Sequence, residues 1–243
     1  MPEADDRSPS PPAAGMPGAL AGDPRGPVLG IGDSITCGPE EGAFGVPPRA
    51  WAQWLAEAQD LPFHRLAEPG AVTPWIAGAL LPRARDDYAL ACLHTGTNDV
   101  RGPDWDGPAF EQALVALVDG LVARAARVCV ATVPLDLGRP PAGPKVAELN
   151  AIVRRVAGER GATVVALDDL RGWRHFFPDA VHPTALGQLE IARRAARALD
   201  LTPDPATMTD VQEGKRADAR YALSRQLAHL ARDWRRRATE RNV

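Results

Sequence analysis

Five short apolar runs alternate with segments of helical periodicity along this chain, and this alternation limits the folds open to it. The runs cover residues 28–31, 63–66, 88–93, 128–133 and 163–167. Apolar residues at helical spacing lie between and after them, from residue 49, through 75–80, over 108–124, through 146–156 and from 183 to about 199. Strands that alternate with helices predict an α/β fold with a parallel sheet and right-handed crossovers.

Four polar clusters follow the predicted strands or lie in a late loop, at residues 32–34, 68–70, 96–99 and 179–182. In a parallel sheet the loops after successive strands share one edge, so residues far apart in the sequence converge there. We therefore expect the functional site at this edge of the sheet.

The residue types in these clusters suit nucleophilic catalysis. Ser34 follows a strand directly, but a serine hydroxyl is a weak nucleophile without a base. His182 is the candidate base because imidazole titrates near neutral pH, and Asp179 can orient its ring. The available donors for an oxyanion are the Asn98 amide and the backbone N–H groups of Gly70 and Ser34.

This constellation resembles the SGNH hydrolases, the GDSL esterase/lipase family. The four blocks occur in the family's order: GDS with Ser34, a second block with Gly70, GTND with Asn98, and DAVHP with Asp179 and His182. One block alone is a weak signal, whereas four in order are a specific one.

The resemblance implies a three-layer α/β/α, flavodoxin-like SGNH fold with about five parallel strands. It also implies ester hydrolysis without a metal or cofactor, with an oxyanion hole formed by Ser34, Gly70 and Asn98. Two positions depart from the family's pattern: Glu68 stands where many members carry asparagine, and Ile35 stands where leucine is common.

The leading hypothesis is a serine esterase that hydrolyses a small-molecule carboxylic ester through an acyl-enzyme. An acyltransferase that uses the same site with an alcohol or sugar acceptor is one alternative. A protein that binds a ligand or partner without catalysis is another. Nucleic-acid binding has only the charge of an arginine-rich C-terminal segment behind it, so no nucleic-acid partner is expected.

Charge and cysteine usage bear on the compartment. The formal net charge is −3, which gives no general attraction to nucleic acid or anionic membranes. The three cysteines, Cys37, Cys92 and Cys129, are odd in number and widely spaced, which argues against a disulfide framework. With no secretion signal in residues 1–26 and no apolar window of ~18 residues, we expect a cytoplasmic protein without stable membrane insertion.

Composition divides the chain into four predicted parts. Residues 1–26 are a predicted disordered tail, 27–201 the SGNH domain, 202–210 a linker and 211–243 a basic amphipathic helix. The last part has nine Lys or Arg residues against four acidic ones, a charge of +5, with its apolar stripe at Leu223, Leu227, Leu230 and Trp234. This stripe can cover the domain or pair two copies of the chain.

Several neighbours of the clusters have structural interpretations. Asp33 and Asp99 are predicted turn and cap residues, and His94 and Cys37 are predicted to pack rather than react. The loop 134–144 can form a pocket wall or lid. Three aromatic residues precede Asp179: Trp173, Phe176 and Phe177. They can line a pocket or pack against residues of their own loop.

Overall fold

The computed structural model describes residues 26–223, and its centre is a parallel sheet. The sheet has five strands in the order β2-β1-β3-β4-β5, which confirms the predicted parallel sheet. The strands are β1 (Val28–Gly32), β2 (Phe63–Ala67), β3 (Leu90–His94), β4 (Val128–Ala131) and β5 (Thr163–Val165).

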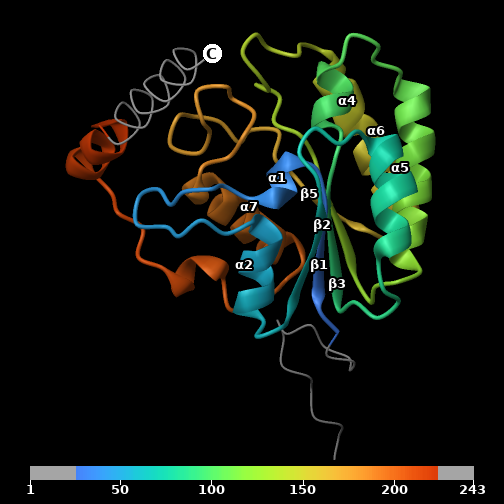
Figure 1. Ribbon diagram of the computed structural model, residues 1–243, viewed down its shortest axis with the longest axis horizontal. Helices are drawn as coiled ribbons and strands as arrows, with labels where there is room; N and C mark the ends of the chain where they lie inside the picture. The colour runs from blue at the N-terminus through green and yellow to red at the C-terminus, as the bar shows by residue number, and fades with distance from the viewer. Residues whose placement is uncertain (1–25, 224–243) are drawn as a thin grey trace, which may run out of the picture.

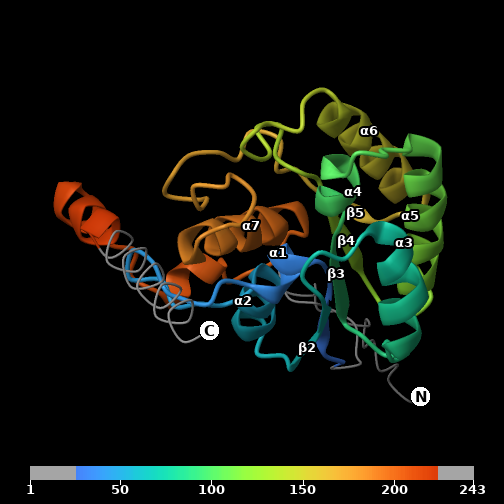
Figure 2. The same ribbon diagram turned by 45° about the horizontal axis from the view of Figure 1, so that its top comes forward.

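Two layers of helices cover the sheet. Helices α2 (Trp51–Ala58) and α7 (Ala185–Ala198) pack together on one face, and α5 (Gly107–Val122) and α6 (Lys145–Glu159) pack together on the other (Figure 1, Figure 2). Because helices cover both faces, β1 and β3 are buried along their whole length. The fold is therefore three-layered α/β/α with a flavodoxin-like strand order, as predicted.

Apolar spacing explains which face each long helix buries. In α5, one stripe at helical spacing is fully or almost fully buried, at Phe110, Leu114, Leu117, Val118 and Leu121. The same periodicity predicts α2 and α6, whose observed bounds lie within a few residues of the predicted ones. Burial of these stripes against the strands builds the hydrophobic core.

Two predicted helices differ in detail. The segment expected to be one helix through 75–80 is α3 (Thr73–Trp75), a π-helix (Ile76–Leu80) and a 3₁₀ turn (Leu81–Arg83) that contains a proline. Pro183 was expected at the first position of the last helix, but α7 begins at Ala185. The cause is Thr184, whose hydroxyl accepts a hydrogen bond from the Gly187 N–H at 3.1 Å and caps the helix.

The ends of the chain are described only in part. Residues 205–208 of the predicted linker form a 3₁₀ helix (Pro205–Met208) that contacts α2 and α7. Residues 215–223 are helical. Residues 1–25 of the predicted tail and the stripe residues Leu227, Leu230 and Trp234 lie outside the described residues. The domain boundaries and pairing through the C-terminal helix stay predictions. Within residues 26–223, no helix has the length and hydrophobicity needed to cross a bilayer.

Strand register brings three of the polar clusters to one edge. Gly32, the last residue of β1, pairs with Ala67 of β2 and with His94 of β3. Each of these residues ends its strand, so the segments that follow start side by side. Ser34, Gly70 and Asn98 therefore all come from the carboxyl edge of neighbouring strands.

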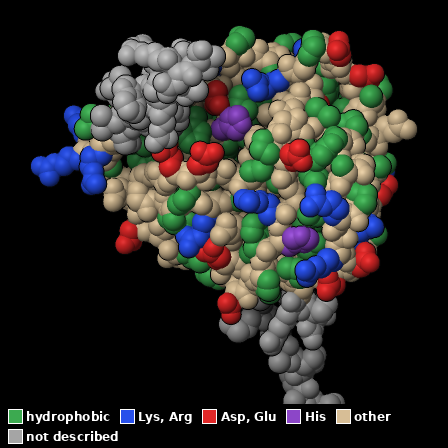
Figure 3. Space-filling model, in the orientation of Figure 1, with side chains coloured by type: hydrophobic (Ala, Val, Ile, Leu, Met, Phe, Trp, Pro, Cys, Tyr) green, Lys and Arg blue, Asp and Glu red, His purple; other side chains and the backbone are tan. Residues whose placement is uncertain are grey.

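Positively and negatively charged side chains are interspersed on the face seen in Figure 3. Many charged side chains of the described residues form surface ion pairs, such as Arg160 with Asp119 at 2.6 Å and Arg49 with Glu57 at 2.8 Å. Exposed pairs of this kind contribute little to stability because water screens them. The apolar core therefore supplies most of the stability of the fold.

Gly32 closes β1 where a side chain cannot fit. Its φ is 154°, and a Cβ built there would lie 2.1 Å from the His94 carbonyl oxygen. Gly32→Ala is therefore expected to lower the free energy of unfolding by more than about 3 kcal/mol, since strain and overlap add. Gly158→Ala in α6 is the matched control: outside the backbone of its own helix and its chain neighbours, no atom lies within 4 Å of its Cβ position, so a gain of up to about 1 kcal/mol is expected. Equal urea midpoints for the two variants would contradict this.

Candidate active site

Ser34 lies at a sharp turn between β1 and a short helix, α1 (Ser34–Cys37). Asp33 caps this helix: its carboxylate accepts a hydrogen bond from the Ile35 N–H at 2.9 Å. This agrees with the predicted cap role of Asp33. Because Ser34 is the first residue of α1, its own N–H has no acceptor within the helix.

A chain of hydrogen bonds joins Ser34 to the late loop before α7. Ser34 Oγ lies 3.0 Å from His182 Nε2, although 148 positions separate the two residues. His182 Nδ1 lies 2.7 Å from Asp179 Oδ2. The imidazole is thus held between a hydroxyl and a carboxylate, an arrangement that can move a proton from the one while the other orients the ring.

The backbone around Asp179 keeps its carboxylate in place. Asp179 Oδ1 accepts from the N–H groups of Val181 at 2.9 Å and His182 at 3.1 Å. Ala180, which lies between Asp179 and Val181, is in the left-handed region, with a φ of 52°. Burial raises the pKa of Asp179, but the hydrogen bonds from the His182 ring and these two N–H groups outweigh it, so the pKa lies below its usual value. Asp179 is therefore ionised at neutral pH.

Gly70 and Asn98 lie after the two strands that flank β1. Gly70 is in a turn with a φ of 80°, and Asn98 is in α4 (Thr97–Arg101). The Asn98 side-chain amide donates to the Ala71 carbonyl at 2.9 Å, which ties the two segments together and leaves its second N–H without a protein acceptor within residues 26–223. The N–H groups of Ser34 and Gly70 likewise donate to no acceptor in the described part of the chain.

Asp99 has a partner that its sequence position did not predict. Its carboxylate accepts from the Thr73 N–H at 3.0 Å and from the Thr73 hydroxyl at 3.2 Å. The Thr73 hydroxyl also lies 2.7 Å from that of Thr95. Burial raises the pKa of Asp99, and the bonds from Thr73 only partly offset this. Asp99 therefore has a structural role, as predicted. It holds the loop after Gly70 in place through Thr73, rather than capping a neighbouring backbone N–H.

His94 lies beneath the turn at Ser34. Its Nδ1 is 3.4 Å from Asp33 Oδ1, and both side chains are almost completely buried. His94 is not among the residues that line the groove at Ser34. This agrees with a packing role for His94.

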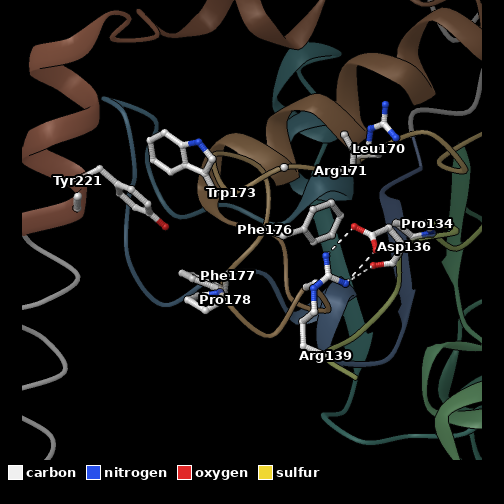
Figure 4. A pocket seen from close by; sticks show the side chains of 13 residues that line it. Pro134, Asp136, Arg139, Leu170, Arg171, Trp173, Phe176, Phe177, Pro178 and Tyr221 are labelled. Atoms are coloured by element: carbon white, nitrogen blue, oxygen red, sulfur yellow. Dashed lines mark hydrogen bonds and ion pairs between the residues drawn. The ribbon is translucent and has the colours of Figure 1, made fainter. Parts of the chain in front are cut away.

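Two neighbouring cavities lie near the loop that carries His182. An open groove of about 920 Å³ contains Ser34 and His182, and a second cavity of about 620 Å³ lies beside it. Phe177 and Pro178 line both. The second cavity is shown in Figure 4, and its lining includes the aromatic residues Trp173, Phe176 and Tyr221. The loop 134–144 contributes Pro134, Asp136 and Arg139. The sequence did not predict that these segments together enclose one cavity.

Cys37 lines the same groove as Ser34. Burial is the main cause that raises the pKa of its thiol, and the nearby Arg65 only partly opposes it. A thiol that stays protonated is a poor nucleophile. The groove therefore favours Ser34 over Cys37 as the reactive group.

Comparisons with known proteins place this chain in a family. The profile of the GDSL-like lipase/acylhydrolase family matches residues 31–189, which is more than half of the chain. No curated protein matches the sequence.

Solved structures share the fold at low sequence identity. An acetylxylan esterase from Geobacillus stearothermophilus is 19% identical, with a TM-score of 0.57 over 78% of this chain and 97% of that one. A lipolytic protein of the G-D-S-L family from Veillonella parvula is 22% identical, with a TM-score of 0.56 over 70% of this chain and 96% of that one. An α/β hydrolase from the metagenome of Lake Arreo, Spain, is 18% identical, with a TM-score of 0.56 over 71% of this chain and 94% of that one. The chain belongs to the GDSL-like lipase/acylhydrolase family and is a carboxylic ester hydrolase.

Proposed function

We propose that this protein is a serine esterase in which Ser34 is the nucleophile, His182 the general base and Asp179 the residue that orients His182. The observation that carries the proposal is the continuous chain of contacts at 3.0 Å from Ser34 Oγ to His182 Nε2 and at 2.7 Å from His182 Nδ1 to Asp179. Each distance is within hydrogen-bonding range.

Acylation begins when Ser34 Oγ attacks the ester carbonyl carbon and its proton passes to His182 Nε2. The carbonyl oxygen becomes an oxyanion, for which the donors are the N–H groups of Ser34 and Gly70 and the free N–H of the Asn98 amide. When the intermediate collapses, His182 gives the proton to the leaving alcohol. Water then repeats the sequence on the acyl-enzyme and releases the acid.

Asp179 supports this cycle by electrostatics. Its lowered pKa keeps the carboxylate ionised at neutral pH. An ionised Asp179 favours the imidazole tautomer with the proton on Nδ1, which leaves Nε2 free to accept from Ser34. It also stabilises the imidazolium that forms after proton transfer.

Acetyl esters are the first substrates to test, because one of the similar structures is that of an acetylxylan esterase. The test is hydrolysis of 4-nitrophenyl acetate combined with labelling by a fluorophosphonate. We expect turnover, and a single adduct on the peptide that contains Ser34, located by mass spectrometry. Folded protein that shows neither turnover nor an adduct would contradict the proposal, and new esters formed with added alcohols in place of acid would favour an acyltransferase.

Asn98→Ala is expected to lower kcat by about 10²–10³-fold, the usual effect of removing one oxyanion donor. Because Asn98 also binds the Ala71 carbonyl, its removal loosens the loop after Gly70. Thr73→Val is the matched control, since it removes a hydroxyl that holds the same loop through Asp99 and Thr95 but leaves the Asn98 amide in place. Steady-state kinetics should show less than about tenfold loss for this control. Equal losses in both variants would contradict an oxyanion role for Asn98.

A further inference from the structure

The cavity beside the catalytic groove is built from three segments distant in sequence. These are the loop with Asp136 and Arg139, the loop 170–178, and the helix at 215–223 that carries Tyr221 (Figure 4). At about 620 Å³ it has the size of pockets that hold small organic ligands. Nothing in the proposed triad chemistry uses it.

The position of the cavity follows from the wall that it shares with the groove. Phe177 and Pro178 line both spaces and directly precede Asp179. The Phe177 N–H donates to the His182 carbonyl at 2.9 Å, so this wall is joined to the catalytic base. The cavity therefore adjoins the groove on its His182 side, whereas Gly38, Arg65 and other residues line the rest of the groove.

Ester chemistry decides which part of a substrate lies on that side. His182 Nε2 must give its proton to the oxygen of the leaving alcohol, so that oxygen must lie next to His182 when the intermediate collapses. The remainder of the alcohol extends from this oxygen, past Phe177 and Pro178. The acyl group is bonded to the carbonyl carbon and extends from it in another direction.

The lining of the cavity suits an apolar ring. The rings of Trp173 and Tyr221 lie with centroids 6.0 Å apart and planes tilted by 33°. Trp173 is 54% exposed, which leaves a large aromatic surface open to a ligand, and Phe176 closes the inner side (Figure 4). An aromatic or alicyclic ring gains by burial against such a surface.

The charged residues of the lining do not oppose an uncharged ligand. Arg139 donates to both carboxylate oxygens of Asp136, at 3.0 Å and 2.7 Å, so these two charges balance each other. In Figure 4 the guanidinium of Arg171 points away from the rings of Phe176 and Trp173. The rings, not the charges, therefore form the contact surface.

We propose that this cavity binds the alcohol portion of the ester and selects alcohols that carry an apolar ring. The proposal rests on the serine esterase mechanism proposed above. It assigns Trp173 and Tyr221 to substrate specificity and leaves the acyl group to the part of the groove away from Phe177.

A pair of reversed esters tests this assignment. In 2-(2-naphthyl)ethyl acetate the ring belongs to the alcohol, in ethyl 2-naphthylacetate it belongs to the acyl group, and ethyl acetate carries no ring. Two variants alter the cavity from different elements: Trp173→Ala removes a ring, and Ala222→Phe fills the space from the C-terminal helix. Their matched controls are Trp75→Ala, a comparably exposed tryptophan on α3, and Leu223→Phe, the neighbour of Ala222 that does not line the cavity.

Trp173→Ala and Ala222→Phe are expected to lower kcat/KM for 2-(2-naphthyl)ethyl acetate by about tenfold, mainly through KM. The other two esters and both control variants should change less than about twofold. Retained turnover of ethyl acetate shows that the variants are folded and that the triad is intact.

Other outcomes overturn the proposal in distinguishable ways. A loss that follows the ring on the acyl side would assign the cavity to the acyl group. Unchanged kinetics, or equal losses on all three esters, would remove the cavity from substrate binding while leaving the esterase mechanism standing. If Ser34 is not needed for the hydrolysis of any of these esters, the mechanism fails and the assignment fails with it.

Discussion

Ser34→Ala is expected to lower kcat for ester hydrolysis by about 10⁵–10⁶-fold. The variant lacks the oxygen that forms the acyl-enzyme, and no other group takes its place. The Cys37 thiol lines the same groove, but burial raises its pKa and keeps it protonated. A residual rate above that in water is still expected, since oxyanion donors and binding remain in place.

The measurement is the initial rate with 4-nitrophenyl acetate, accompanied by fluorophosphonate labelling of both proteins. Cys37→Ala is the control, because it removes the other candidate nucleophile from the groove. It should retain activity within about threefold, since the thiol takes no part in the cycle. If Ser34→Ala keeps wild-type activity, or if Cys37→Ala loses it, the proposed nucleophile is wrong.

His182→Ala is expected to lower kcat by a similar factor, about 10⁵–10⁶-fold. His182 Nε2, 3.0 Å from Ser34 Oγ, takes the proton of the nucleophile and returns it to the leaving alcohol. Without the ring both transfers need water. Because residues that act as one unit are not additive, the double variant with Ser34→Ala should be no less active than either single variant.

Added imidazole distinguishes a lost base from a distorted loop. Free imidazole can enter the open groove and should restore part of the activity of His182→Ala, but none of that of Ser34→Ala. His64→Gln is the control histidine: it contacts Tyr88 at 2.6 Å at the far end of β2 and should leave kcat unchanged. Activity of His182→Ala close to that of the wild type would exclude His182 as the base.

Much of the fold could be predicted because burial leaves a periodic pattern. A strand covered on both faces must be apolar throughout, as in the run that contains β3, and a helix covered on one face must be apolar at every third or fourth position, as in α5. Element ends were less predictable because they depend on single hydrogen bonds. Thr184 rather than Pro183 sets the start of α7, because the Thr184 hydroxyl accepts a hydrogen bond from the Gly187 N–H.

The predicted site residues depended on block order and residue chemistry, not on distances. The parallel topology explains why Ser34, Gly70 and Asn98 lie at one sheet edge, because each follows a neighbouring strand. The contact of Asp99 with Thr73 had no signal in the sequence, since 26 positions separate them and neither belongs to a periodic pattern. The pairing of Asp33 with His94 was hidden for the same reason.

By itself the sequence determined the parallel sheet, its covering helices and the residue types available for acyl chemistry, because each of these depends on local pattern or on the identity of a side chain. Tertiary structure alone decided the 3.0 Å contact between Ser34 and His182, the attachment of Thr73 to Asp99 and the aromatic cavity beside the groove. Each joins segments far apart along the chain. Whether such distant segments come into contact depends on how the whole core packs, and no local pattern of residues predicts that packing.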